Sequence, residues 1–165
     1  MIAAGVLYVR QKMNKFLNQL KSLDPGDAVE ADEIDGIYDL VDSFFQEQGK
    51  LDQNAQKAII GLFEKFPTDY YSHVLWNIIH GLEHFGGYEK CLIDSVTNSP
   101  SCTGVVMVSR LLNGGFYEFE GLSYLSLLND TSTRTDCSEE VSQRAGELIS
   151  SYNKKQAEQD VASNL

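Results

Sequence analysis

The residues whose spacing comes closest to that of a catalytic site are the histidines. All of them fall on one face of a predicted helix, at steps of four, three and four residues with one asparagine: His73, Asn77, His80 and His84. We call this set the histidine stripe. The run His80-Gly81-Leu82-Glu83-His84 also has the H-x-x-E-H order in which two histidines bind zinc and the glutamate acts as a base.

A zinc site of this kind needs a further carboxylate ligand from a distant part of the chain. The candidates are Glu118, Glu120 and Glu139, and none of them stands out from the others. We therefore expect the histidine stripe to be the polar face of its helix, without catalytic residues, a metal or another cofactor.

A second set of residues suggests binding rather than catalysis. The chain has no lysine or arginine between Asp24 and Glu47, and the middle of one predicted helix in that stretch holds Asp32, Glu33, Asp35, Asp39 and Asp42. We call these five residues the acidic segment. Its aspartates follow three-, four- and three-residue steps along one helical face, where each like-charged pair costs about 0.2–0.5 kcal/mol. The acidic segment therefore predicts a cationic partner that would relieve this repulsion, the alternative being a solvated face.

Glu83 and Arg110 are charged residues on predicted helices that are otherwise rich in apolar residues. A buried charge is costly unless it is paired in good geometry. We expect the two side chains to pair between adjacent helices and to support the fold. The alternative is that Glu83 is exposed near the end of its helix.

Other nucleophile and phosphate-binding signals are missing from the sequence. No serine lies in a Gly-x-Ser-x-Gly turn, and no glycine run has the spacing of a phosphate-binding loop. The cysteines, Cys91, Cys102 and Cys137, are odd in number and have no Cys-x-x-Cys spacing. We expect Cys91 and Cys102 to be small buried thiols in a reducing compartment, and we expect the protein not to be an enzyme.

Size and charge limit the function further. The chain has 165 residues and a formal net charge of −11. This length suits a single domain, 1–165, with a polar and frayed tail from about residue 154. The charge argues against binding to nucleic acid or to an anionic membrane, and it points either to a basic partner or simply to solubility. No segment has the length of a membrane span, so we expect a cytoplasmic protein.

Apolar residues recur at helical spacing along most of the chain. We expect an all-α domain of about seven helices in stacked antiparallel pairs, as in an irregular bundle or a short α-solenoid. The helical segments are Leu7–Leu23, Glu30–Gln48, a third that begins at Asp52 or Asn54 and ends at Phe66, Tyr71–Phe85, Tyr88–Asn98, Ser99–Asn113 (Ser99 as N-cap, Pro100 as first residue), Phe116–Asn129 and Ser138–Tyr152. A glycine weakens the prediction for Phe116–Asn129. The β-branched run Val105–Val108 is where a strand would be expected if this prediction were wrong.

One part of the chain resembles a known family. The run Leu75-Trp76-Asn77-Ile78-Ile79-His80-Gly81-Leu82-Glu83, followed by Tyr88, Ser99-Pro100 and Arg110-Leu111-Leu112-Asn113, resembles a signature of helical immunity proteins. These belong to bacterial polymorphic-toxin systems, including contact-dependent growth inhibition. The resemblance covers about Tyr70–Gly115. It implies a small all-α cytoplasmic protein that binds one cognate toxin domain, often a nuclease, and blocks its active site.

The residues and the resemblance together predict an immunity protein that neutralises a basic, nuclease-type toxin domain through the acidic segment. Nucleases are commonly basic where they bind phosphates, and an acidic helix can occupy such a site. Two alternatives remain. One is a small metal-dependent hydrolase that uses His80, Glu83 and His84. The other is a generic helical protein-interaction scaffold.

Overall fold

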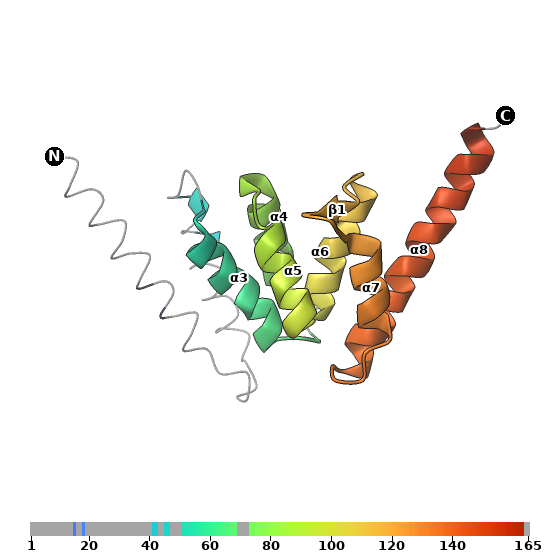
Figure 1. Cartoon of the computed structure of the whole chain (residues 1–165). Helices are drawn as coiled ribbons and strands as arrows, with labels where there is room; N and C mark the ends of the chain where they lie inside the picture. The colour runs from blue at the N-terminus through green and yellow to red at the C-terminus, as the bar shows by residue number, and fades with distance from the viewer. Residues whose placement is uncertain are drawn as a thin grey trace.

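The computed structural model describes residues 51–68 and 73–163, together with six single positions nearer the N-terminus: Lys15, Asn18, Val41, Asp42, Phe45 and Gln46. Its elements are α3 (Gln53–Lys65), α4 (His73–Phe85), α5 (Glu89–Asn98), α6 (Cys102–Asn113), β1 (Glu118–Phe119), β2 (Leu122–Ser123), α7 (Tyr124–Ser132) and α8 (Glu139–Ser163) (Figure 1). The predicted all-α class is confirmed in broad terms. The described residues hold six helices and one small two-stranded sheet, against about seven helices predicted for the whole chain. The helices predicted at Leu7–Leu23 and Glu30–Gln48 lie almost entirely outside the described residues.

Helix α6 lies at the centre of the described fold. It packs against α3, α5, α7 and α8, and all of its residues from Cys102 to Ser109 are buried. A helix that is apolar on every side is stable only when neighbours surround it. Gly104 brings α5 close, because a Cβ at this position would lie 3.0 Å from a methyl group of Val96.

The start of α6 corrects one prediction. Ser101, not Ser99, is the N-cap, and its hydroxyl accepts a hydrogen bond from the Gly104 N–H at 3.0 Å. Ser99 instead ends α5, and its N–H donates to the carbonyl of Ser95. Pro100 therefore lies in the short link between the two helices. The C-terminal end of α6 agrees with the sequence, since Gly114 caps it and Gly115 has a φ of +86°.

The helix predicted at Phe116–Asn129 is wrong in its first half. Strands β1 and β2 form an antiparallel hairpin there, with Phe119 opposite Leu122, and α7 begins only at Tyr124. Glu120 and Gly121 make the turn with φ values of +49° and +82°. Positive φ at both central residues is the signature of a tight hairpin turn and is incompatible with a continuing helix. The run Val105–Val108, where a strand was the alternative, lies within α6.

Helix α8 is longer than predicted. The sequence suggested an end near Tyr152 and a frayed tail from about residue 154, but the helix continues to Ser163. Val141, Ala145 and Tyr152 anchor its first part in the core, whereas most side chains after Tyr152 are exposed. The extension consists mainly of lysine, glutamine, alanine and glutamate, which are good helix formers without tertiary support. Among the described residues, no helix combines the length and apolar character needed to cross a membrane.

Candidate functional site

Most of the acidic segment lies outside the described residues, namely Asp32, Glu33, Asp35 and Asp39. Asp42 is described, and it lies on a helical turn whose two sides differ. Val41 is buried, and the ring of Phe45 packs against that of Phe85 with centroids 5.7 Å apart. Asp42 is half-buried, and its carboxylate accepts a hydrogen bond from the exposed Gln46 amide at 2.7 Å. At this turn Val41 and Phe45 therefore contact the core, and Gln46 is exposed.

Gly81 in the middle of α4 provides the contact surface for this turn. A Cβ built on Gly81 would collide with the ring of Phe45. Because Gly81 has no side chain, the Phe45 ring can approach the backbone of α4 at this point. This close approach positions Asp42 relative to α4.

Glu83 and Arg110, for which the sequence suggested a pair, form an ion pair that joins α4 to α6. The Nε and Nη2 atoms of Arg110 donate to the two carboxylate oxygens of Glu83 at 2.5 and 2.8 Å. The side chains are 27% and 37% exposed for Glu83 and Arg110, so solvent reaches the pair. The hydrogen bond from Arg110 holds the pKa of Glu83 below its ordinary value of 4.5, against the opposing effect of partial burial.

Two further side chains complete this cluster, and sequence reasoning missed both as partners of the pair. The Arg110 guanidinium lies over the Trp76 ring, 5.5 Å from its centroid. His80 places Nδ1 3.5 Å from a Glu83 carboxylate oxygen. Trp76, His80 and Glu83 are spaced at four and three residues on α4, so their shared face was visible in the sequence. What the sequence did not show was that Arg110 would lie against it.

The cluster is poorly suited to zinc-assisted hydrolysis. Both oxygens of Glu83 accept hydrogen bonds from Arg110, and its lowered pKa makes it a weak base. His80 and His84 are exposed, and His84 packs edge-on against Phe85. The side chain of His73 lies outside the described residues. Over the described part of the chain, no three His, Cys, Asp or Glu side chains are grouped closely enough to hold a metal.

The cysteines are all free thiols. Cys102 is buried as predicted, whereas Cys91 and Cys137 are half-buried. Burial raises the pKa of Cys91 and that of Cys102. Because the thiolate is the reactive form, these two thiols are poor nucleophiles at neutral pH.

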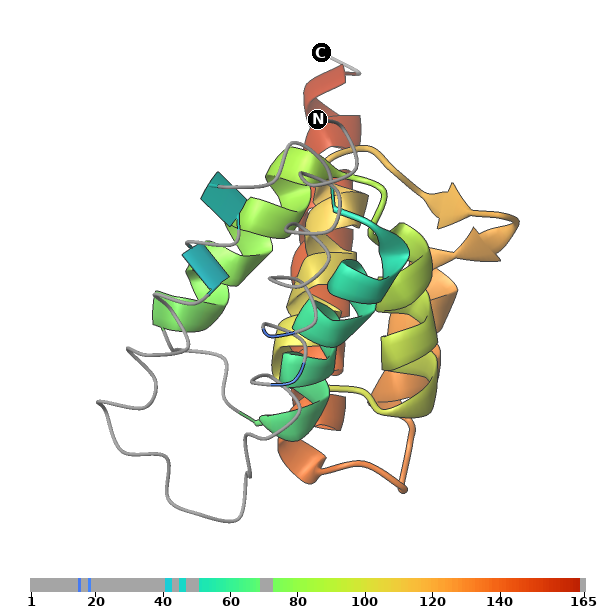
Figure 2. The ribbon, with the colours of Figure 1, turned by 90° about the vertical axis from the view of Figure 1, so that its left-hand side faces the viewer.

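The hairpin forms a second surface. It projects from the helical body beside α5 (Figure 2). Phe116 and Tyr117, just before β1, are 63% and 59% exposed, which is unusual for such large side chains. A pocket of about 210 Å³ lies between the hairpin and α5, and it is lined by Lys90, Ile93, Asp94, Phe119, Glu120 and Leu122. Because a helix was predicted at Phe116–Asn129, the hairpin and its pocket were not expected, although Gly121 is a residue typical of turns.

The chain was compared with protein-family models, curated proteins and solved structures, and it matches none of them.

Proposed function

We propose that this protein is an immunity protein, which binds a cognate basic toxin domain of the nuclease type and neutralises it in the cytoplasm. The observation that carries the proposal is the orientation of the turn at Asp42. Val41 and Phe45 contact the core there, while the Asp42 carboxylate accepts a hydrogen bond from the exposed Gln46 amide. Asp39, Asp35 and Asp32 precede Asp42 by helical steps, so a continuous helix would present all four carboxylates on that outward side.

An outward acidic face suits a protein that must block a phosphate-binding site. A nuclease attracts its substrate with basic residues, and these residues would meet the acidic segment instead. Charge complementarity speeds association and discriminates against wrong partners. The net charge of −11 also attracts a basic toxin domain over longer distances.

The remaining architecture supports a compact binding protein. We propose that the helices form stacked antiparallel pairs, because α5 packs against the next helix α6, and α7 packs against α8. Short links join each pair, as in bundles and short α-solenoids. We propose that Trp76, Glu83 and Arg110 support the fold rather than contact the toxin, because Arg110 on α6 pairs with Glu83 and lies over Trp76 on α4.

The test is co-expression with the C-terminal domain of a large toxin gene immediately upstream of the gene for this protein. We expect wild-type protein to protect the cell. The double variant Asp35→Asn, Asp39→Asn should protect less, because it loses two charges while keeping its shape. In purified form its association should be slower and less sensitive to added salt.

A matched control removes two charges elsewhere. Glu139 and Glu140 are exposed in the first turn of α8, so Glu139→Gln with Glu140→Gln changes the net charge equally. This control should keep full protection. If the two double variants behave alike, the acidic segment is only a solvated face. If wild-type protein gives no protection, the immunity function is wrong and a helical scaffold takes its place.

The hydrolase alternative receives no support from the geometry of Glu83. Its carboxylate would have to leave Arg110 before it could activate a metal-bound water. We therefore propose that the protein acts by binding and has no enzymatic activity of its own.

A further inference from the structure

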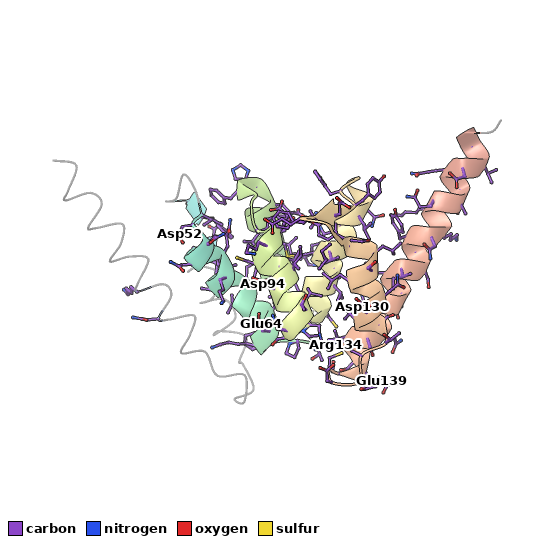
Figure 3. The ribbon with its side chains drawn as sticks, in the orientation of Figure 1. Asp52, Glu64, Asp94, Asp130, Arg134 and Glu139 are labelled. Atoms are coloured by element: carbon purple, nitrogen blue, oxygen red, sulfur yellow. The ribbon has the colours of Figure 1, made fainter. Side chains whose placement is uncertain are left out.

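The pocket between α5 and the hairpin combines apolar walls with two carboxylates. Ile93, Phe119 and Leu122 provide the apolar part. Asp94 comes from α5 and Glu120 from the hairpin turn, so two different elements bring their charges to one pocket of about 210 Å³. Figure 3 shows Asp94 on α5 in the middle of the molecule.

Both of these acidic residues are exposed. In residues 51–68 and 73–163 no ion pair includes Asp94 or Glu120. Lys90 also lines the pocket, four residues before Asp94, but its ammonium is not within ion-pair distance of that carboxylate. A lysine that precedes an acidic residue by four positions is in the weaker of the two orientations on a helix. The pocket therefore keeps a net negative charge.

The neighbouring aromatic side chains are held on an ordered backbone. The Phe116 N–H donates to the carbonyl of Leu111 at 3.0 Å, and the Tyr117 carbonyl accepts from the Tyr124 N–H at 3.0 Å. These two hydrogen bonds fix the backbone that carries both exposed rings, directly before β1. Exposed aromatic side chains on a fixed backbone are typical anchors of protein–protein contacts.

We infer that this pocket binds an arginine side chain of a basic partner protein. Arginine has an aliphatic stem that can pack on Ile93 and Leu122 and a planar guanidinium that binds carboxylates through paired hydrogen bonds. A nucleic acid is excluded as the occupant by the negative charge of both the pocket and the whole chain. Phe116 and Tyr117 then contact the partner surface around that arginine.

A titration with N-acetyl-L-arginine amide tests this inference. The control ligand is N-acetyl-L-citrulline amide, which has nearly the same shape but no charge. We expect the arginine amide to cause saturable shifts in the amide NMR signals of residues 89–94 and 116–122, and we expect the citrulline amide to cause none there. Equal shifts with both ligands, or no saturable shift with the arginine amide, would overturn the inference.

Variants of the full chain test whether binding of the arginine amide depends on the charges in the pocket. Asp94→Asn and Glu120→Gln should each weaken arginine amide binding about two- to fivefold, the range for solvent-exposed ion pairs. Lys90→Gln should strengthen it, because it removes a like charge from the pocket. Glu139→Gln removes one charge at the start of α8, away from Asp94 in Figure 3, and should leave binding unchanged. If Asp94→Asn and Glu139→Gln bind alike, the attraction is non-specific and the pocket is not the site. The titration contains no toxin, so its outcome is independent of the proposed function.

Discussion

The Glu83 carboxylate is held in its charged form by Arg110, and this has a consequence for stability at different pH values. Its pKa is below the ordinary value of 4.5 in the fold. A depressed pKa means that the charged carboxylate stabilises the folded state, so the contribution is present above about pH 4.5 and disappears as the pH falls through the folded pKa. The pair is partly exposed, which limits the contribution to about 1 kcal/mol.

We expect Glu83→Gln to lower the free energy of unfolding by about 1 kcal/mol near pH 7, with the difference from wild type shrinking towards pH 3. Urea unfolding at both pH values measures it. Glu147→Gln is the control, since its pair with Arg144 lies within α8, three residues apart, instead of joining two helices, and should matter less. Equal stability of Glu83→Gln and wild type at neutral pH would show that the pair does not support the fold.

Glu120 occupies a backbone conformation that suits another residue better. Its φ is +49°, and left-handed conformations cost most non-glycine residues about 1–2 kcal/mol. Asparagine tolerates this region more easily. We expect Glu120→Asn to raise the melting temperature by about 2–4 °C, the shift that corresponds to roughly 1 kcal/mol in a domain of this size.

Glu118→Asn is the matched control for this turn, because it removes the same charge from a position with an ordinary backbone. It should give no increase in melting temperature. An equal increase in both variants would indicate relief of charge repulsion rather than of backbone strain. Glu120→Asn also removes a carboxylate from the hairpin pocket, so the stabilised variant should lose affinity for arginine amide.

Some of the side-chain contacts described above could be predicted from the residue types alone. A glutamate and an arginine on apolar helices suggested the Glu83–Arg110 pair, since burial makes isolated charges costly. The stacking of Arg110 on Trp76 could not be inferred, because it depends on how α4 and α6 lie against each other. The serine that caps α6 was misassigned because Ser99 and Ser101 both suit an N-cap, and only the observed hydrogen bond to Gly104 distinguishes them.

At the scale of elements, Gly81 determines how the turn at Phe45 packs on α4. Alanine in a helix interior is normally about 0.5–1 kcal/mol more favourable than glycine. At Gly81 we expect the opposite, because a methyl group would displace the Phe45 ring. Gly81→Ala should lower the free energy of unfolding by about 1–3 kcal/mol, the usual effect of overpacking.

Gly61 in α3 provides the comparison, since nothing lies within 4 Å of a Cβ built there. Gly61→Ala should therefore stabilise the protein by the normal helical increment, as measured by the same urea titration. A similar gain in both variants would show that Phe45 does not pack against Gly81.

The elements themselves were predictable where the apolar period was long. Helices α3 to α6 and the start of α8 follow from that period and from their caps. The hairpin was not predictable in this way, because each of its strands has only two residues, too few for an alternating pattern to be recognised. The far end of α8 was missed for another reason: helix propensity, rather than an apolar face, determines it.

At the scale of the whole molecule, the two candidate binding surfaces are separate. In Figure 2 the turn that contains Val41 and Phe45 lies beside α4, on the opposite side of the molecule from the hairpin. Substitutions on one surface should therefore leave the other intact, as expected for distant sites. The sequence showed that both surfaces contain acidic residues. It could not show that α5 and the hairpin lie side by side and form one pocket.

The position of Trp76 also gives the protein an internal optical reporter. It is the only tryptophan in the chain, and its ring lies against the Arg110 guanidinium where α4 meets α6. Indole emission depends on solvent exposure and on nearby charges, so the fluorescence of the unlabelled protein reports on this one junction. Separation of α4 from α6 can thus be followed in real time, while circular dichroism follows the helices as a whole.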